Sequence, residues 1–194
     1  MRSITVTMWM SLDGVVQGLG RQDEDTRGGF THGGWGRHYD DEVLAREMGQ
    51  AMSKPGDMLF GRRTWQDFIT AWSQRTDGNP VTTRMNETTK YVVSRTLESA
   101  DDWQNSVLLR GEAADAVADL KSQPGQDLGI VGSASLVRSL HAAGLIDRYT
   151  LVICPLTLGS GARLFEGHAP MTEFELARSV PTTKGAIIAH YARR

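Results

Sequence analysis

The chain has 194 residues, the length of one ordinary domain. It is 40% hydrophobic and 23% charged, so it can bury a sizeable core, and its net charge of −2 lacks the basic excess that nucleic-acid binding usually needs. The single cysteine, Cys154, excludes an internal disulfide and a multi-cysteine zinc site. The five histidines are scattered without a metal-ligand spacing, so we expect no structural metal.

Two further features concern the location of the protein. The chain lacks an apolar run of the roughly 20 residues that a membrane helix needs. It begins directly in strand-like alternation and not in the apolar block of a signal peptide. These features predict a cytoplasmic protein that binds neither a membrane nor nucleic acid.

A glycine-rich stretch follows the first expected strand, which covers residues 4–9. Residues 18–36 contain seven glycines, so the stretch is either a disordered surface loop or a lid over a site. Phe30 and Trp35 are unusual in a solvated linker and favour the lid. Because ordering so many glycines is entropically costly, we expect an open form without ligand.

The next elements follow from apolar spacing. A helix is expected after Asp40, which can cap it, with Asp41 and Glu42 in its first turn. A short buried strand at residues 57–60 precedes a helix whose aromatic face runs from Trp65 to Trp72. Residues 76–89 are expected to be a polar loop built around a turn.

The second half alternates strands with helices and ends in a hairpin, which predicts an α/β fold whose sheet has an antiparallel edge. Glycine at position 144 is well placed to end the last helix. The expected strands are residues 90–94, 106–109, 128–131, 149–154, 173–177 and 186–191, and the expected helices are residues 112–122 and 136–143.

Three strand ends are candidates for binding a phosphate, because helix N-termini expose N–H groups and ligands bind beyond the carboxyl ends of strands in open α/β sheets. The turn at residues 61–64 contains two arginines, although Thr64 can be a simple helix cap. The turn at residues 94–96 is a common tripeptide with a guanidinium group. The turn at residues 132–135 contains small residues, which let backbone N–H groups approach a pyrophosphate.

Taken in this order, the motifs resemble the dihydrofolate-reductase-like superfamily, and most closely the reductase domain of the riboflavin-biosynthesis deaminase-reductase. The resemblance covers essentially the whole chain and implies a single domain over residues 1–194. It implies a dihydrofolate-reductase-like mixed, mostly parallel sheet with helices on both faces and an antiparallel C-terminal hairpin. The segments that carry it are residues 10–14, 59–65, 90–94, 103–107, 130–133 and 155–165.

The resemblance implies an NADPH-dependent oxidoreductase that transfers a hydride to a small heterocycle. That substrate would be pterin- or folate-like, or similar to 5-amino-6-(5-phosphoribosylamino)uracil. The alternatives are a flavin- or deazaflavin-dependent reductase and a non-catalytic nucleotide- or ligand-binding protein that retains the reductase fold. Because members of the resembled family commonly pair, and a bare sheet edge is unfavourable, we also expect a homodimer.

The resemblance also assigns site residues. The candidate catalytic residues are Asp13, at the junction with the substrate, and Asp41, near the position of the acid on the first helix. Val15 stands where the riboflavin enzyme usually has lysine, which leaves the substrate open. The implied cofactor-binding residues are Trp9 and Ser11 for the nicotinamide, Gly61, Arg62, Arg63 and Thr64 for the adenosine-side phosphates, Ser94 and Arg95 for the 2′-phosphate, and Gly132, Ser133, Ala134 and Ser135 for the pyrophosphate.

Overall fold

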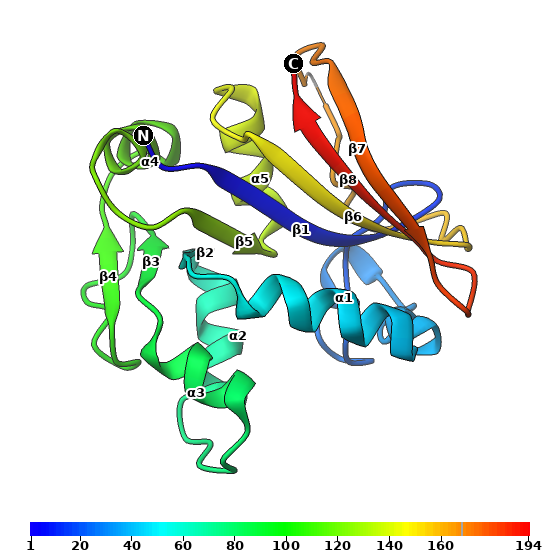
Figure 1. Cartoon of the computed structure of the whole chain (residues 1–194), viewed down its shortest axis with the longest axis horizontal. Helices are drawn as coiled ribbons and strands as arrows, with labels where there is room; N and C mark the ends of the chain where they lie inside the picture. The colour runs from blue at the N-terminus through cyan, green and yellow to red at the C-terminus, as the bar shows by residue number, and fades with distance from the viewer. Residues whose placement is uncertain (168) are drawn as a thin grey trace. The chain divides into compact units, whose positions relative to one another are not determined.

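The computed structural model describes residues 1–167 and 169–194, so His168, one of the five histidines, lies outside the described residues. The described chain contains strands, α-helices and two short 3-10 helices (Figure 1). The strands are β1 (Ile4–Ser11), β2 (Asp57–Gly61), β3 (Lys90–Val93), β4 (Ser106–Leu109), β5 (Leu128–Val131), β6 (Arg148–Cys154), β7 (Phe174–Pro181) and β8 (Ile187–Arg193). The helices are η1 (Arg27–Gly29), η2 (Trp35–Tyr39), α1 (Glu42–Ser53), α2 (Arg62–Trp72), α3 (Pro80–Glu87), α4 (Ala113–Ser122) and α5 (Ala134–Ala142).

The eight strands are hydrogen-bonded in the order β4-β3-β2-β5-β1-β6-β8-β7. Strands β4, β3, β2 and β5 pair in parallel, whereas β6, β8 and β7 pair antiparallel. The predicted mixed sheet with an antiparallel C-terminal hairpin is therefore confirmed. The chain divides into two compact units, and the expectation of a single domain stays a prediction. The first unit comprises Met1–Thr5 and Lys54–Ile146, and the second comprises Val6–Ser53 and Asp147–Arg194.

Aromatic packing on β2 forms the core of the first unit. Phe60 is fully buried, and its ring lies 5.2 Å from that of Phe68 and 6.3 Å from that of Trp103. Trp65 of α2 is also fully buried, as the aromatic spacing predicts. Because β2 and β5 run in parallel as neighbours, the turns that follow them leave the sheet at the same edge.

The expected loop at residues 76–89 is wrong in its second half, where the structure has α3. The side chain of Asn79 accepts a hydrogen bond from the N–H of Val81 at 2.9 Å and so caps the helix. Pro80 occupies the first helical position, where a missing N–H costs nothing. Met85 is buried on the inner face. The Asn-Pro pair was the signal for this helix, but it was interpreted as part of a turn.

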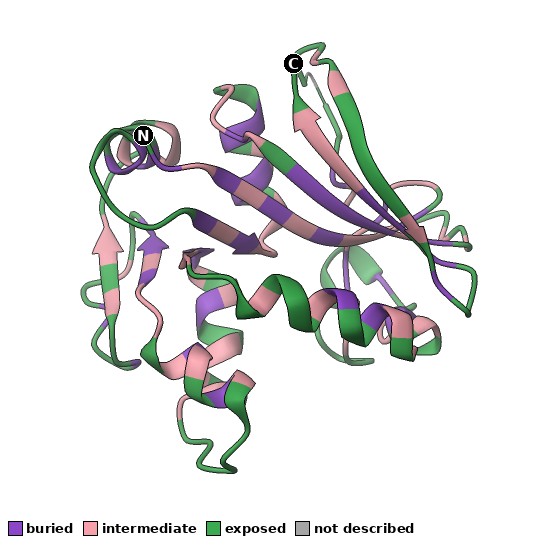
Figure 2. Cartoon of the chain, viewed as in Figure 1, coloured by how far each residue is buried: buried purple, intermediate pink, exposed green. Residues whose placement is uncertain are grey.

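The second unit packs α1 and the 18–36 segment around one apolar cluster. Figure 2 colours the chain by burial and shows buried positions recurring along α1 and the strands. Helix α1 begins one residue later than expected, because Asp41 and not Asp40 is its cap: its Oδ1 accepts the N–H of Leu44 at 2.8 Å. The buried members of the cluster are Val15, Phe30, Trp35, Leu44, Val152, Cys154, Ala186 and Ile188.

The 18–36 segment is packed into the second unit and is not a disordered surface loop, because Phe30 and Trp35 are only 4% and 6% exposed. Its role as a lid that becomes ordered with ligand stays a prediction. Two of its glycines allow close contact: a Cβ on Gly33 would lie 2.1 Å from the carbonyl oxygen of Gln22, and one on Gly36 would lie 2.2 Å from Leu19. The glycines therefore permit dense packing here.

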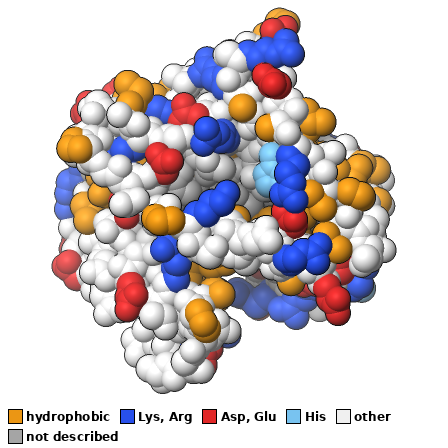
Figure 3. Space-filling model, viewed as in Figure 1, with side chains coloured by type: hydrophobic (Ala, Val, Ile, Leu, Met, Phe, Trp, Pro, Cys, Tyr) orange, Lys and Arg blue, Asp and Glu red, His pale blue; other side chains and the backbone are white. Residues whose placement is uncertain are grey.

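The helices, the surface charges and the edge of the sheet bear on what the protein can contact. Within the part of the chain that the structure describes, none of the helices is long and apolar enough to cross a membrane. Basic and acidic side chains are interspersed over the face shown in Figure 3. Strand β7, the last in the sheet order, is exposed along most of its length. The homodimer expected from such an edge stays a prediction.

Candidate functional site

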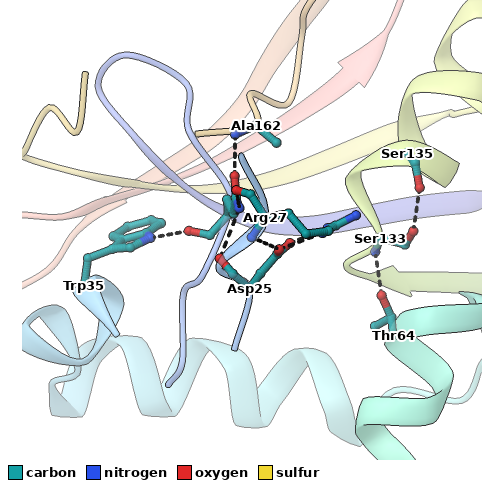
Figure 4. Close-up of polar contacts among 8 residues, drawn as sticks. Asp25, Arg27, Trp35, Thr64, Ser133, Ser135 and Ala162 are labelled. Carbon is teal, nitrogen blue, oxygen red and sulfur yellow. Dashed lines mark hydrogen bonds and ion pairs between the residues drawn. The ribbon is translucent and has the colours of Figure 1, made fainter. Parts of the chain in front are cut away.

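The turns after β2 and β5 meet in the first unit, and they contain most of the predicted phosphate-binding residues. The backbone N–H of Ser133 donates to Oγ1 of Thr64 at 3.3 Å, and the hydroxyls of Ser133 and Ser135 lie 3.1 Å apart (Figure 4). A Cβ on Gly61 would come within 2.7 Å of the Ser133 hydroxyl, so glycine is required for this approach. The structure thus brings the 61–64 and 132–135 turns together.

Both turns lead directly into a helix, and the residue before each helix provides no side-chain cap. Among the described residues, neither Gly61 before α2 nor Ser133 before α5 makes a side-chain capping hydrogen bond. The alternative in which Thr64 simply caps α2 is wrong, because Thr64 is the third residue of that helix and its hydroxyl binds the other turn. Two adjacent helix N-termini present backbone N–H groups and partial positive charge.

Gly132 adopts a left-handed backbone conformation, with φ of +74°, which disfavours side chains. The nearest atom to a Cβ built there is the Thr64 methyl group at 3.5 Å, an ordinary contact. A side chain at this position would therefore lie against Thr64, across from the turn after β2. Arg62, half-buried, and Arg63, exposed, lie in the first turn of α2. Backbone N–H groups, hydroxyls and nearby guanidinium groups are the donors that phosphate oxygens accept from.

Ser94 and Arg95 directly follow β3 at the same edge of the sheet, because Val93 at the end of β3 pairs with Gly61 at the end of β2. The Ser94 hydroxyl accepts the N–H groups of Thr96 and Leu97 at 3.1 and 3.0 Å, so it stabilises its own turn. The Arg95 guanidinium lies 2.9 Å from the Glu112 carboxylate, and both side chains are exposed. Among the hydrogen bonds of residues 1–167 and 169–194, none joins Ser94 or Arg95 to the two glycine turns.

In the second unit, the predicted nicotinamide residues lie at the end of β1. Trp9 is half-buried and packs against the apolar cluster. Ser11 is fully buried, and its hydroxyl donates to Asp13 at 2.6 Å and accepts the N–H of Val15 at 2.9 Å. Ser11 therefore fixes the turn that follows the strand.

Asp13 fastens that turn to the 156–164 loop. Its carboxylate accepts hydrogen bonds from the Ser11 hydroxyl and from the N–H groups of Leu158 and Gly159 at 3.1 and 2.9 Å. The Ser11 hydrogen bond, with the two backbone ones, lowers the pKa of Asp13 to about 2 although burial opposes this. The lowered pKa favours the ionised carboxylate at neutral pH, and the hydrogen bonds hold the turn against the loop.

Asp41 has the same character. Besides capping α1, it accepts the Thr183 hydroxyl at 2.8 Å and the N–H of Lys184 at 3.0 Å. The Leu44 N–H, and then these bonds, hold the pKa of Asp41 well below its usual range. The carboxylate therefore ties the start of α1 to the turn between β7 and β8. The catalytic roles expected for Asp13 and Asp41 stay predictions.

The sequence analysis missed Gln17, which is 7% exposed. Its Nε2 donates to the carbonyl oxygens of Asp25 and Arg27 at 3.0 and 2.9 Å, and its Oε1 accepts the N–H of Ala162 at 2.9 Å (Figure 4). Its own carbonyl oxygen accepts the indole N–H of Trp35 at 2.8 Å. A glutamine just before a glycine-rich loop belongs to no periodic pattern, so sequence alone offered no signal for this role.

A second missed group lies between α1 and the C-terminal hairpin. Arg178 of β7 makes a bidentate ion pair with Glu47 of α1, at 2.7 and 2.8 Å, and lowers the pKa of that carboxyl. His190 pairs in register with both Arg178 and Thr150, and its Nδ1 lies 3.1 Å from the Thr150 hydroxyl. Only the tertiary structure gathers these four residues.

Metal and thiol chemistry have little support in the described residues. Residues 1–167 and 169–194 contain no group of three or more His, Cys, Asp or Glu that could hold a metal ion. Cys154 is buried, and burial raises the pKa of its thiol to about 11. The thiol is therefore protonated at neutral pH and is not a nucleophile.

The strand order, the antiparallel C-terminal hairpin and the paired glycine turns define a dihydrofolate-reductase-like architecture. Residues 2–188 match the model of the RibD C-terminal domain, and the chain belongs to this family. The family implies a reductase of the riboflavin-pathway type, and its members typically bind a nicotinamide cofactor. This is the same family that the sequence motifs resemble.

Two curated relatives come from Bacillus subtilis strain 168, and both are named as uncharacterized proteins. YyaP is 30% identical over 111 residues, which are 56% of this chain and 58% of YyaP. YwjB is 30% identical over 105 residues, which are 54% of this chain and 59% of YwjB. The matched region thus spans less than two thirds of either relative.

Two solved structures share the fold across nearly the whole chain. One is a candidate riboflavin biosynthesis protein from Shewanella sp. PV-4, with a TM-score of 0.69, 18% identity and 99% coverage of both chains. The other is a pyrimidine reductase-like protein from Corynebacterium diphtheriae, with a TM-score of 0.67, 12% identity, and coverage of 100% of this chain and 92% of that one. At these identities the likeness establishes the fold alone.

Proposed function

We propose that the protein is an NADPH-dependent oxidoreductase that transfers a hydride to a small nitrogen heterocycle. The substrate class is pterin- or folate-like, or similar to 5-amino-6-(5-phosphoribosylamino)uracil. The observation that carries this proposal is the joined pair of glycine turns in the first unit. Family membership supplies the reaction class, and the turns supply a place for the cofactor's phosphates.

The two turns fit a pyrophosphate for three reasons. Gly132 has a left-handed backbone that lacks a side chain, the residues before α2 and α5 make no side-chain cap, and two arginines lie in the first turn of α2. In this proposal Gly132, Ser133, Ala134 and Ser135 hold the pyrophosphate, while Gly61, Arg62, Arg63 and Thr64 hold the adenosine-side phosphates. Ser94 and Arg95 are the proposed contacts for the 2′-phosphate, which would have to compete with Glu112 for Arg95.

The second unit would take the nicotinamide at the end of β1, beside Trp9 and Ser11. When bound, NADPH supplies the hydride, so the protein needs only to orient it and exclude water. Trp9 offers an apolar surface, and the buried Ser11 fixes the turn beside it. Among the described acids, Asp13 and Asp41 are held as anions by structural hydrogen bonds.

That last observation favours one second candidate function, a protein that binds the nucleotide or another ligand without turnover. Neither predicted acid supplies a proton at neutral pH, and a fold can be kept after an activity is lost. Consumption of NADPH in the presence of pterin and pyrimidine acceptors separates the two candidates. Turnover with any acceptor supports the reductase, and tight binding without turnover supports the binding protein.

The test of the cofactor is a comparison of dissociation constants for NADPH and NADH. A charge-assisted contact to the 2′-phosphate contributes roughly 1.5–3 kcal/mol, so NADPH should bind about tenfold to a hundredfold more tightly. Arg62→Ala and Arg63→Ala should weaken NADPH binding, whereas Arg21→Ala, on an exposed arginine of the second unit, should not. Equal affinities for the two cofactors would contradict the proposal.

A further inference from the structure

The geometry points to Gln17 as a positioning residue that holds the walls of the nicotinamide end of the proposed cofactor site. This inference rests on the proposed function. Gln17 lies six residues beyond Ser11 in the second unit. It would not touch the cofactor, and it would act by fixing the two segments that flank the end of β1.

The hydrogen-bonding capacity of the Gln17 carboxamide is almost entirely used. Both N–H donors of Nε2 are taken by backbone carbonyls at residues 25 and 27, and Oε1 accepts from the backbone of Ala162. A carboxamide offers two donors and one acceptor oxygen, so this side chain satisfies three backbone groups at once. Because it is 7% exposed, water cannot easily replace these bonds.

These bonds connect two segments that are far apart in the sequence. Residues 25 and 27 belong to the 18–36 segment, and Ala162 belongs to the 156–164 loop. The 156–164 loop also binds the chain beyond β1 through two backbone bonds of 2.9 Å, from Val16 to Ala162 and from Leu164 to Gly14. The Gln17 side chain therefore joins both segments to the end of β1.

The segments that the Gln17 side chain joins are tightly packed, so their separation is fixed. A Cβ on Gly161 would lie 2.8 Å from both Phe30 and Val15, so the loop, the 18–36 segment and the post-strand turn meet at van der Waals distance. Releasing the carboxamide would let Phe30 and Trp35 move away from this contact. The surface on which Trp9 packs would then lose its shape, while the glycine turns of the first unit contain none of these residues.

The experiment compares ligands that carry different halves of the cofactor. Gln17→Glu is isosteric but removes both donors and sets a negative charge against two carbonyl oxygens. Gln17→Met is a second variant that removes the bonds without adding charge. Gln22→Glu is the matched control, because Gln22 is exposed and lies in the same segment. Each folded variant is titrated with NADPH and with adenosine 2′,5′-bisphosphate, which lacks the nicotinamide.

We expect both Gln17 variants to bind NADPH about tenfold more weakly, and adenosine 2′,5′-bisphosphate within about twofold of the unmodified protein. The control should change neither constant. Unchanged NADPH binding, or an equal loss for both ligands, overturns the positioning role while leaving the proposed function intact. Failure of the unmodified protein to bind either ligand overturns both.

A measurement on the unmodified protein keeps the inference testable if both variants fail to fold. Amide hydrogen exchange is followed in residues 18–36 and 156–164. NADPH should increase protection in both segments together, and adenosine 2′,5′-bisphosphate should change neither. Protection that rises in one segment only, in neither segment with NADPH, or with both ligands alike, contradicts a shared support for the nicotinamide end.

Discussion

Two glycine-containing regions of this protein use the same residue type for opposite purposes. In the 18–36 segment, glycines let backbone and apolar side chains come so close that a single added carbon at Gly33 or Gly36 would overlap a neighbour. In the turn after β5, Gly132 has a left-handed backbone and only an ordinary contact above it. The first region uses glycine for close packing, and the second uses it for a backbone conformation that side chains disfavour.

The comparison teaches that glycine density does not measure mobility. Seven glycines in a segment suggest a high entropic cost of ordering, but Phe30 and Trp35 bury enough surface to offset part of it. Asp13 and Gln17 add fixed hydrogen bonds to the neighbouring loop. In the described residues, the turn after β5 is joined to the turn after β2 by a hydrogen bond from Ser133 to Thr64.

The largest effect is expected for Gly33→Ala. Its Cβ would lie 2.1 Å from one backbone oxygen and 2.8 Å from another, so the chain must shift, and overpacking of this kind costs about 2–3 kcal/mol. Chemical denaturation measures the loss in free energy of unfolding. Gly49→Ala is the control, because Gly49 is an exposed residue of α1 whose Cβ would meet nothing within 4 Å, and alanine there should add about 0.5–1 kcal/mol. A tolerated Gly33→Ala would mean that the segment is loose.

A smaller effect is expected for Asp13→Asn, which weakens the fastening of the 156–164 loop. Hydrogen bonds to a charged acceptor are stronger, so the variant should lose about 1–2 kcal/mol at pH 7. Because folding lowers the pKa of Asp13 from 3.8 to about 2, its contribution is present above pH 4 and disappears as the pH falls through 2.

The free energies of unfolding of the variant and the unmodified protein should therefore converge between pH 4 and pH 2. Urea unfolding across that range checks this. Asp23→Asn is the matched control, because the Asp23 side chain is 85% exposed and should contribute little at any pH. A difference that is independent of pH would show that shape, and not charge, makes Asp13 important.

The smallest change in folding, but a clear change in binding, is expected for Gly132→Val. A β-branched side chain is strained at a φ of +74° and would crowd Thr64 where the two turns meet. NADPH affinity should fall about tenfold while circular dichroism still shows a folded protein. Gly132→Asn tolerates the left-handed backbone better and separates strain from crowding. Unchanged NADPH binding by folded Gly132→Val would remove this turn from the site.

Local patterns in the sequence determined most of the elements and the family. Alternation gave β1, and aromatic spacing gave α2, because one buried face imposes a fixed period on apolar residues. The turns at residues 61–64 and 132–135 were recognisable because helix starts and small residues are local features. The cap of α1 was misplaced by one residue, since Asp40 and Asp41 have equal intrinsic capping ability.

Only the tertiary structure decided what the polar side chains do. The resemblance made Asp13 a candidate catalytic residue, and its carboxylate binds the N–H groups of Leu158 and Gly159, about 145 residues further along the chain. Gln17 depends on Ala162 in the same way, and Glu47 on Arg178. A hydrogen bond needs a partner at a set distance and direction, and a sequence pattern carries no information about partners that the fold brings from elsewhere.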